Sequence, residues 1–286
     1  MLIIISLLLS IFTANTNAER VSPYGAEVIS LAEGGRAFLK GYDAIMINPA
    51  GAYFVDSSEA GFGINFGYSY ASMSAMYAGE NGFQFGVAVK DLDKHWSVDS
   101  MQTYVGYSYE LSKWWIIGAN TGYNFVSTHR GWDMNFGISF GPGLPTANRS
   151  GLIGAITIRN PFENAGAGTG EVSGSIGYSY RSSFNLCIDN IYVFQDTDHP
   201  NSNGTYPDRY DIVFAIETFP LEEDDFSMTF SGRINSVGDY NELKVGAGFG
   251  YIITTSSRFN FGAYATGFSH SRIQNMTFGL SFVQGM

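Results

Sequence analysis

Bulky apolar residues alternate with small or polar residues through most of this chain, from Glu59 onward. A period of two places successive side chains on opposite faces, which predicts β-strands. The alternation recurs at three separate places: Phe62, Ile64, Phe66, Tyr68 and Tyr70 against Gly61, Gly63, Asn65, Gly67 and Ser69; Val172, Ile176, Tyr178 and Tyr180 against Ser173, Ser175, Gly177 and Ser179; and Leu243, Val245, Ala247, Phe249 and Tyr251 against Lys244, Gly246, Gly248 and Gly250. The second face is mostly Gly, Ser and Asn, without the Lys and Glu of a water-exposed sheet. This pattern favours an all-β transmembrane antiparallel barrel with a narrow, filled lumen.

Runs bounded by turn residues predict about fourteen strands. They lie near 59 to 70, 72 to 78, 82 to 90, 101 to 110, 114 to 126, 131 to 141, 150 to 160, 171 to 181, 183 to 194, 208 to 219, 225 to 236, 241 to 253, 257 to 268 and 272 to 283. The connections after even strands are mostly short and those after odd strands are mostly long, as in barrels with short periplasmic turns and long outer loops. The stretch from Gly141 to Arg149 is a long connection after an even strand and departs from this rule.

The segment from Ser30 to Gly51 precedes the strands and has a different character. Gly34 and Gly35 permit a tight bend or a close backbone approach. Asp43 is a plausible N-cap for a short apolar helix from Ala44 to Ile47, which must stop because Pro49 forces Asn48 out of the helical region. A helix of one turn needs a larger body to dock on, so we expect residues 19 to 58 to form a plug against the barrel of residues 59 to 286.

Composition and targeting agree with this arrangement. Aromatic residues make up 16% of the chain and charged residues 14%, and the formal net charge is -11, which argues against a nucleic-acid partner. Residues 1 to 18 predict a secretory signal peptide, with an apolar stretch from Met1 to Phe12 and cleavage after Ala18. No later apolar run is long enough for a helical membrane span. The single cysteine, Cys187, excludes an internal disulfide and is expected to be a small buried or lipid-facing side chain.

The order Gly34-Gly35, Phe38, Asp43-Ala44 and Asn48-Pro49-Ala50-Gly51 resembles the N-terminal signature of the FadL and PorV outer-membrane barrel superfamily. The resemblance covers about twenty residues and continues weakly from Leu152 to Phe162 and through the last hairpin. It implies a fourteen-stranded barrel in the bacterial outer membrane with Gly34, Gly35, Asp43, Asn48, Pro49 and Ala50 in a plug or gate. Arg36 and Lys40 stand where many relatives carry smaller residues, which bears on the lining of any passage.

Two further patterns fit an outer-membrane barrel. Gly-Tyr-Ser-Tyr occurs three times near predicted strand ends, and its tyrosines are candidates for a membrane girdle: Tyr68, Tyr70, Tyr107, Tyr109, Tyr178 and Tyr180. General strand propensity would also favour tyrosine at these positions. Phe278, Leu280 and Phe282 resemble the C-terminal strand by which such barrels are recognised for assembly, although four residues follow Phe282.

The sequence gives little support for catalysis, a cofactor or a metal site. The four histidines, His95, His129, His199 and His270, are scattered without ligand spacing, and His270-Ser271 is the one pair that a lipid hydrolase could use. Oxygen-bearing residues from Asp196 to Asn203 could hold Ca²⁺ but miss the EF-hand spacing, and Glu222 to Asp225 is best interpreted as a solvated turn. An inward Glu217 is expected to pair with an arginine such as Arg233.

Two functional hypotheses follow from the resemblance, and a soluble exported β protein is a third. The first is binding or passage of a small hydrophobic compound through an apolar pocket near the plug, released when the segment around Gly34 and Gly35 shifts. Added bulk at Gly35 should then block uptake. The second is a PorV-like subunit that holds secreted proteins or parts of a type IX secretion system, with the outer loops carrying the function. Outer-membrane lipid is a partner in both.

Overall fold

A computed structural model describes residues 24–55, 57–67, 70–93, 98–126, 131–144, 150–161, 170–180, 183–194, 208–220, 226–237, 240–254, 256–266 and 275–286 of the 286-residue chain. The signal peptide expected at residues 1 to 18, all four histidines, the loop from Asp196 to Asn203 and the turn from Glu222 to Asp225 lie outside these residues, so those interpretations stay predictions.

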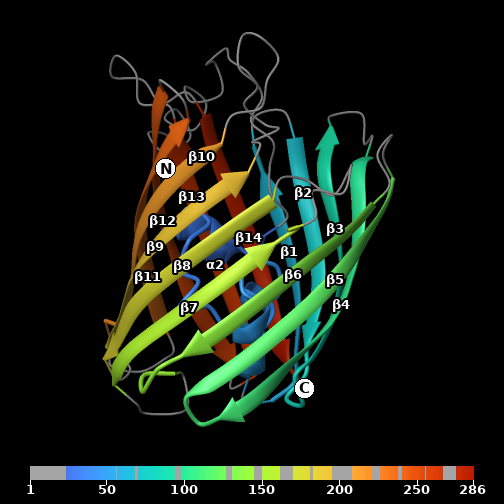
Figure 1. The fold of residues 1–286 in the computed structure, drawn as a ribbon. Helices are drawn as coiled ribbons and strands as arrows, with labels where there is room; N and C mark the ends of the chain where they lie inside the picture. The colour runs from blue at the N-terminus through green and yellow to red at the C-terminus, as the bar shows by residue number, and fades with distance from the viewer. Residues whose placement is uncertain are drawn as a thin grey trace.

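Fourteen antiparallel strands form a closed barrel in which each strand pairs with its sequence neighbours and the first strand pairs with the last (Figure 1). The strands are β1 (Glu59–Phe66), β2 (Tyr70–Ala78), β3 (Phe83–Asp93), β4 (Val98–Ser112), β5 (Trp115–Val126), β6 (Gly131–Phe140), β7 (Gly151–Arg159), β8 (Gly170–Tyr180), β9 (Phe184–Phe194), β10 (Arg209–Thr218), β11 (Phe226–Val237), β12 (Tyr240–Thr254), β13 (Ser257–Thr266) and β14 (Asn275–Gly285). The predicted fold class is therefore confirmed, with every expected strand present.

The alternation of side chains divides each strand between an outer and an inner face. Large apolar side chains cover the outside, and many of them are about half exposed, such as Phe62, Phe85, Ile188 and Phe214. The inner positions are buried and mostly polar or small. This outward apolar band is what a strand wall needs when lipid surrounds it. None of the helices in the described part of the chain is long and apolar enough to cross a membrane.

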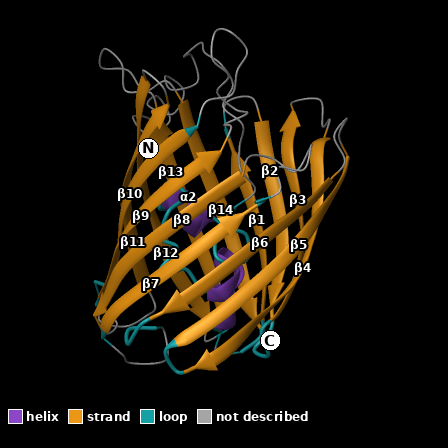
Figure 2. Cartoon of the chain, in the orientation of Figure 1, coloured by secondary structure: helices purple, strands orange, loops and turns teal. Residues whose placement is uncertain are grey.

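The described chain before β1, which begins at Tyr24, folds inside the lumen, as Figure 2 shows by the purple helices enclosed by orange strands. It contains α2 (Ala26–Ser30), α3 (Gly41–Ala44) and the 3₁₀ helix η1 (Pro49–Tyr53). The lumen-filling segment from Tyr24 to Ser58 is called the plug below. Its apolar side chains, among them Ile29, Leu31, Ile45 and Ile47, are almost fully buried and form the principal core of the molecule.

The helix expected from Ala44 to Ile47 is wrong in position. The structure places α3 three residues earlier, with Lys40 at its N-cap, and Asp43 lies inside the helix. The carboxylate of Asp43 instead accepts a hydrogen bond from Arg258 of β13 at 3.1 Å. Asn48 provides the actual side-chain cap, because its Oδ1 accepts from the Ala50 backbone N–H and Pro49 opens η1.

Inward glycines let the plug lie directly on the wall. A Cβ placed on Gly118 would lie 2.5 Å from the Ala50 nitrogen, and one on Gly262 would lie 2.0 Å from the Ala26 carbonyl oxygen. The ring of Tyr42 covers Gly61, whose Cβ would lie 2.4 Å from it. The period-two glycines are therefore contact surface for the plug, as their position in strands predicts.

The tyrosines proposed for a girdle lie at both ends of the barrel. Tyr107, Tyr109, Tyr178 and Tyr180 point outward and are substantially exposed near the short-turn end. Tyr70 begins β2 at the opposite end, and Tyr68 lies outside the described residues. Phe278, Leu280 and Phe282 lie on β14, where Phe282 pairs with Phe62 of β1 and so forms part of the closing seam. Their girdle and assembly roles remain predictions.

Candidate functional site

The contact of η1 with β3 to β6 is made by uncharged groups. Gln84 and Ser108 both donate to the Pro49 carbonyl, at 2.9 and 2.8 Å, and Asn120 donates to the Ile45 carbonyl at 2.6 Å. Asn48 is fully buried and donates to Ser139 Oγ at 3.0 Å and to the Arg36 carbonyl at 2.8 Å. Amide and hydroxyl side chains thus satisfy the irregular backbone of the plug inside the barrel.

A left-handed bend follows α2. Ala32, Glu33 and Gly35 have φ values of 50°, 64° and 85°. Glycine adopts such angles freely, whereas each of the two other residues is strained by roughly 1–2 kcal/mol. The Glu33 N–H donates to the Val28 carbonyl at 2.9 Å, which closes the end of α2. The sequence predicted a bend at Gly34 and Gly35, and the structure extends it to residues 32 to 35. This segment is called the bend below.

Arg36 ties the bend to β8 and β9. Its guanidinium donates to Glu171 at 2.6 Å and to Asp189 at 3.3 Å, and its backbone N–H donates to Asp189 at 3.2 Å. The same guanidinium donates to the Glu33 carbonyl at 2.8 Å. Burial opposes the positive charge, but the carboxylates of Glu171 and Asp189 outweigh burial and hold the pKa of Arg36 above its ordinary value. The charge is therefore permanent and paired.

Arg233 reaches the same bend from β11. It donates to the Ala32 carbonyl at 3.2 Å, to Glu33 at 2.8 Å and to Asp211 of β10 at 2.5 Å. The expected pairing of Arg233 with Glu217 is wrong. Glu217 does lie inward, but it accepts from Asn185 at 2.9 Å, because it sits three inward positions from Asp211 along β10, toward the short-turn end.

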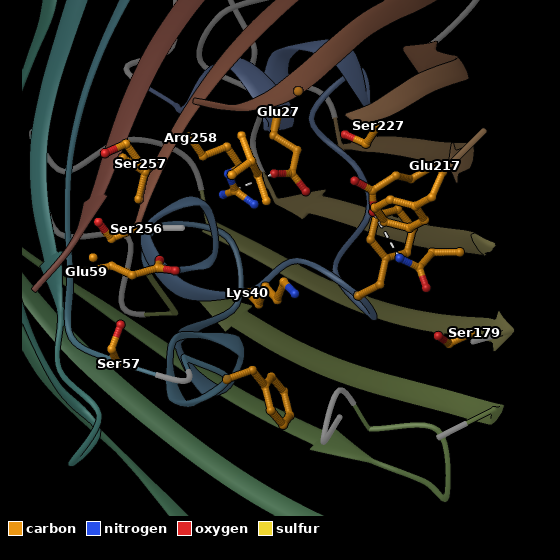
Figure 3. Close-up of a pocket in the computed structure, with 18 of the residues that line it drawn as sticks. Glu27, Lys40, Ser57, Glu59, Ser179, Glu217, Ser227, Ser256, Ser257 and Arg258 are labelled. Atoms are coloured by element: carbon orange, nitrogen blue, oxygen red, sulfur yellow. Dashed lines mark hydrogen bonds and ion pairs between the residues drawn. The ribbon is translucent and has the colours of Figure 1, made fainter. Parts of the chain in front are cut away.

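A cavity of about 280 Å³ opens between the plug and the wall at the short-turn end. Figure 3 shows Glu27 facing Arg258 and Lys40 extending from the plug into the space, with Glu217 on the far wall. Serine hydroxyls from several strand ends contribute most of the remaining polar lining, including Ser179 and Ser227. The lining of this pocket beside the plug is therefore more polar than apolar. The apolar pocket that the sequence-based hypothesis placed near the plug stays a prediction.

Acidic groups of the plug converge on one arginine beside this cavity. Arg258 pairs with Asp43 at 3.1 Å and with Glu27 at 3.5 Å. Burial, reinforced by the charge of Glu27 and opposed by that of Arg258, raises the pKa of the Asp43 carboxyl well above its usual range. Among the described residues, no group of histidine, cysteine and acidic side chains is arranged to hold a metal ion.

The inward positions of β9 connect the cavity with the bend. Asn185 lines the cavity, Cys187 follows it, and Asp189 bonds Arg36. Cys187 is buried, as expected. Beyond Asp189, Ile191 and Val193 join Val213 of β10 in a small apolar cluster separate from the main core. A Cβ on Gly34 would lie 2.5 Å from Val213 Cγ1.

The structure brings the predicted plug residues to three different places. Gly34 and Gly35 lie at the bend, Asn48, Pro49 and Ala50 lie at the uncharged contact, and Asp43 lies at Arg258. Sequence reasoning missed the wall carboxylates that bind the plug, and it named Arg233 with a different partner. Their signal was present, because Glu171, Asp189, Asp211 and Arg233 occupy the otherwise small or polar inner face of their strands.

Comparison with known proteins addresses the fold. No family model matches the sequence, and no curated protein matches it either. The structure resembles the Pseudomonas putida toluene transporter TodX with a TM-score of 0.66 and 10% identity, covering 92% of this chain and 98% of that one. It resembles the monoaromatic hydrocarbon channel CymD with a TM-score of 0.64 and 11% identity, over 92% and 97% of the two chains. A Pseudomonas aeruginosa FadL homologue gives a TM-score of 0.60 and 10% identity, over 94% and 100%.

These observations define a fourteen-stranded membrane-type barrel that is closed by an internal plug. More particularly, the protein has the fold of the FadL-type barrels, and the fold expected from the N-terminal resemblance is confirmed.

Proposed function

We propose that this protein lies in the bacterial outer membrane and binds or passes small hydrophobic compounds. The observation that carries the proposal is the structural match to a toluene transporter, which covers nearly the whole of both chains. The apolar outer face supports the membrane location. The buried plug supports a regulated passage, because the lumen is filled in the described structure.

The inner face of β9 and β10 supplies a candidate route. Ile191, Val193 and Val213 offer apolar contact on an inner wall that is otherwise largely polar or small. The bend lies next to them at Gly34, and the polar cavity follows at the short-turn end. A hydrophobic compound would be held at the apolar cluster, would pass when the bend shifts, and would be released from the polar cavity because polar walls bind it weakly.

A substitution at Gly34 tests this route. Gly34→Leu places a side chain against Val213, because even a Cβ at this position would lie 2.5 Å from Val213 Cγ1. The leucine side chain would therefore occupy the space next to the apolar cluster. Gly35 is a less direct choice, because its φ of 85° means that any side chain alters the bend itself. We expect Gly34→Leu to reduce uptake of labelled toluene to the level of host cells without the barrel.

Gly174→Leu is the matched control, because Gly174 is exposed on β8 with no atom near its Cβ position. Both variants should reach the outer membrane in equal amounts and keep the heat-dependent gel migration of a folded barrel. Normal toluene uptake by assembled Gly34→Leu protein would contradict the route, and equal uptake with and without the wild-type protein would contradict the function.

The PorV-like alternative depends on the outer loops, and the loop from residue 195 to residue 207 lies outside the described residues. No described contact favours it. Co-purification of secreted proteins with the barrel, lost on deletion of Asp196 to Asn203, would be the result that supports it.

A further inference from the structure

We propose that Arg36 and Arg233 form a latch that holds the plug closed against β8 to β11, and that releasing it extends the short-turn cavity along β9. The inference deepens the proposed function, on which it rests, by assigning the closing contact of the passage to two positioning residues. It concerns the bend and its partners Glu171, Asp189 and Asp211.

The first support is the concentration of charge on the bend. Both arginine side chains are nearly inaccessible, at 2% for Arg36 and 3% for Arg233, and the side chains of Asp189 and Asp211 are fully buried. The two guanidiniums together reach two carbonyl groups of the bend, the Glu33 carboxylate and three wall carboxylates. Such pairs are costly to separate, because each charge left alone in the lumen loses its partner without gaining water.

The second support is backbone strain at the place where the arginines act. Ala32 and Glu33 hold left-handed angles that a free loop would abandon, and Arg233 bonds both residues directly. Strained backbone persists only where its surroundings fix it, and it is common in segments that switch. The bend is thus a segment whose conformation depends on contacts made from the wall.

The third support is the order of groups along β9. Asn185 lines the cavity, the next inward residue Cys187 is buried, and Asp189 accepts from the Arg36 backbone N–H. A Cβ on Gly177 of the neighbouring strand would lie 3.2 Å from Ala37 Cβ and 3.1 Å from Cys187 Cβ, so the chain just after Arg36 also covers this position. If the bend moves away, Cys187 becomes the first wall residue added to the cavity.

Cys187 therefore reports the state of the latch without any engineering, since it is the chain's only cysteine. The purified protein in phospholipid vesicles would be treated with a charged methanethiosulfonate reagent, and the modification rate measured by mass spectrometry. We expect slow modification of the wild type and a rate higher by about tenfold or more in Arg36→Met and in Arg233→Met, because each loses a buried charged contact. Arg36→Lys keeps the charge but loses the planar guanidinium group, so its Cys187 modification rate should be intermediate.

Arg209→Met is the matched control. Arg209 pairs with the same Asp211 at 3.0 Å, but from the wall, with a side chain that is 13% exposed. Its loss should leave the Cys187 rate unchanged. Glu171→Gln and Asp211→Asn conserve shape and weaken the same pairs, so they replace the arginine variants if those fail to assemble, and they should also raise the rate.

Assembled barrels that lack the latch contacts but show wild-type Cys187 modification would overturn the proposal. An equal rise with Arg209→Met would overturn it too, by indicating general loosening of the wall. The assay contains no hydrophobic compound. Faster Cys187 modification in the latch variants of a protein without toluene uptake therefore argues against the transport function only. Wild-type Cys187 rates in the latch variants of a protein whose uptake is abolished by Gly34→Leu argue against the latch only.

Discussion

The plug is held on two sides by different chemistry. Toward β3 to β6, η1 is bonded by amides and hydroxyls, and each bond joins an uncharged group to a backbone carbonyl or to another such group. Toward β8 to β11, the bend is bonded by paired arginines and carboxylates. Neutral bonds contribute modestly and independently, whereas buried ion pairs lose much more when one partner is removed. The comparison implies a plug that is held by uncharged hydrogen bonds toward β3 to β6 and by ion pairs toward β8 to β11.

The largest effect is expected from breaking the ion pairs between the bend and β8 to β11. Arg233→Met leaves Asp211 and Glu33 without this partner inside the lumen, and such losses typically cost about 3–5 kcal/mol. The free energy of unfolding, measured by urea titration in phospholipid vesicles, should fall by that order. Arg209→Met should cost clearly less, because the Arg209 side chain is more exposed. Equal losses in the two variants would remove the distinction between bend and wall.

A smaller loss of stability is expected at the uncharged contact of η1 with β3 to β6. Asn48→Ala removes the cap of η1 and the bonds to Ser139 and to the Arg36 carbonyl, and the unsatisfied groups should cost about 1–3 kcal/mol in the same titration. Ser139→Ala removes only one of these bonds and should cost about 1 kcal/mol. A loss for Asn48→Ala as large as that for Arg233→Met would mean that the two sides are not different in kind.

The smallest effect is a pH dependence at Asp43. Because burial holds the pKa of this carboxyl above its value in the unfolded chain, the protonated form is favoured in the folded protein. The stabilisation of the folded protein by this carboxyl is complete below the ordinary pKa and is lost as pH rises through the elevated pKa. The free energy of unfolding then changes by at most about 1.4 kcal/mol per pH unit. Asp43→Asn should flatten this part of the stability profile. An unchanged profile would show that Glu27, Glu59 and Arg258, which face Asp43, set its pH response together.

The wall could be predicted from the sequence because its rule is local. A period of two, interrupted by turn residues, gave strands that the structure reproduces within a few residues at nearly every boundary, as at Gly131–Phe140 and Phe184–Phe194. Lumen filling also followed, because Gly61 and Gly248 had no other evident use on an inner face.

The plug was harder to predict because its contacts are not local. Asp43 precedes a short apolar run, which suggested an N-cap, but its partner Arg258 lies 215 residues away. Arg36 meets Asp189 across 153 positions and Glu171 across 135. Inward charge could be seen strand by strand, whereas its pairing required the barrel register. The sequence-based pairing of Glu217 with Arg233 rested on their charges alone. The strand register places Arg233 opposite Val213 and Glu217 opposite Thr229, so the two side chains are apart.

The closing seam limits when the barrel can close. The plug precedes β1, β1 pairs only with β2 and β14, and β14 comes last in the chain. The final residues also fasten the exit of the plug, since the Met286 N–H donates to the Ser58 carbonyl at 2.7 Å. The ring of strands can therefore close only when β14, the last strand along the described chain, pairs with β1.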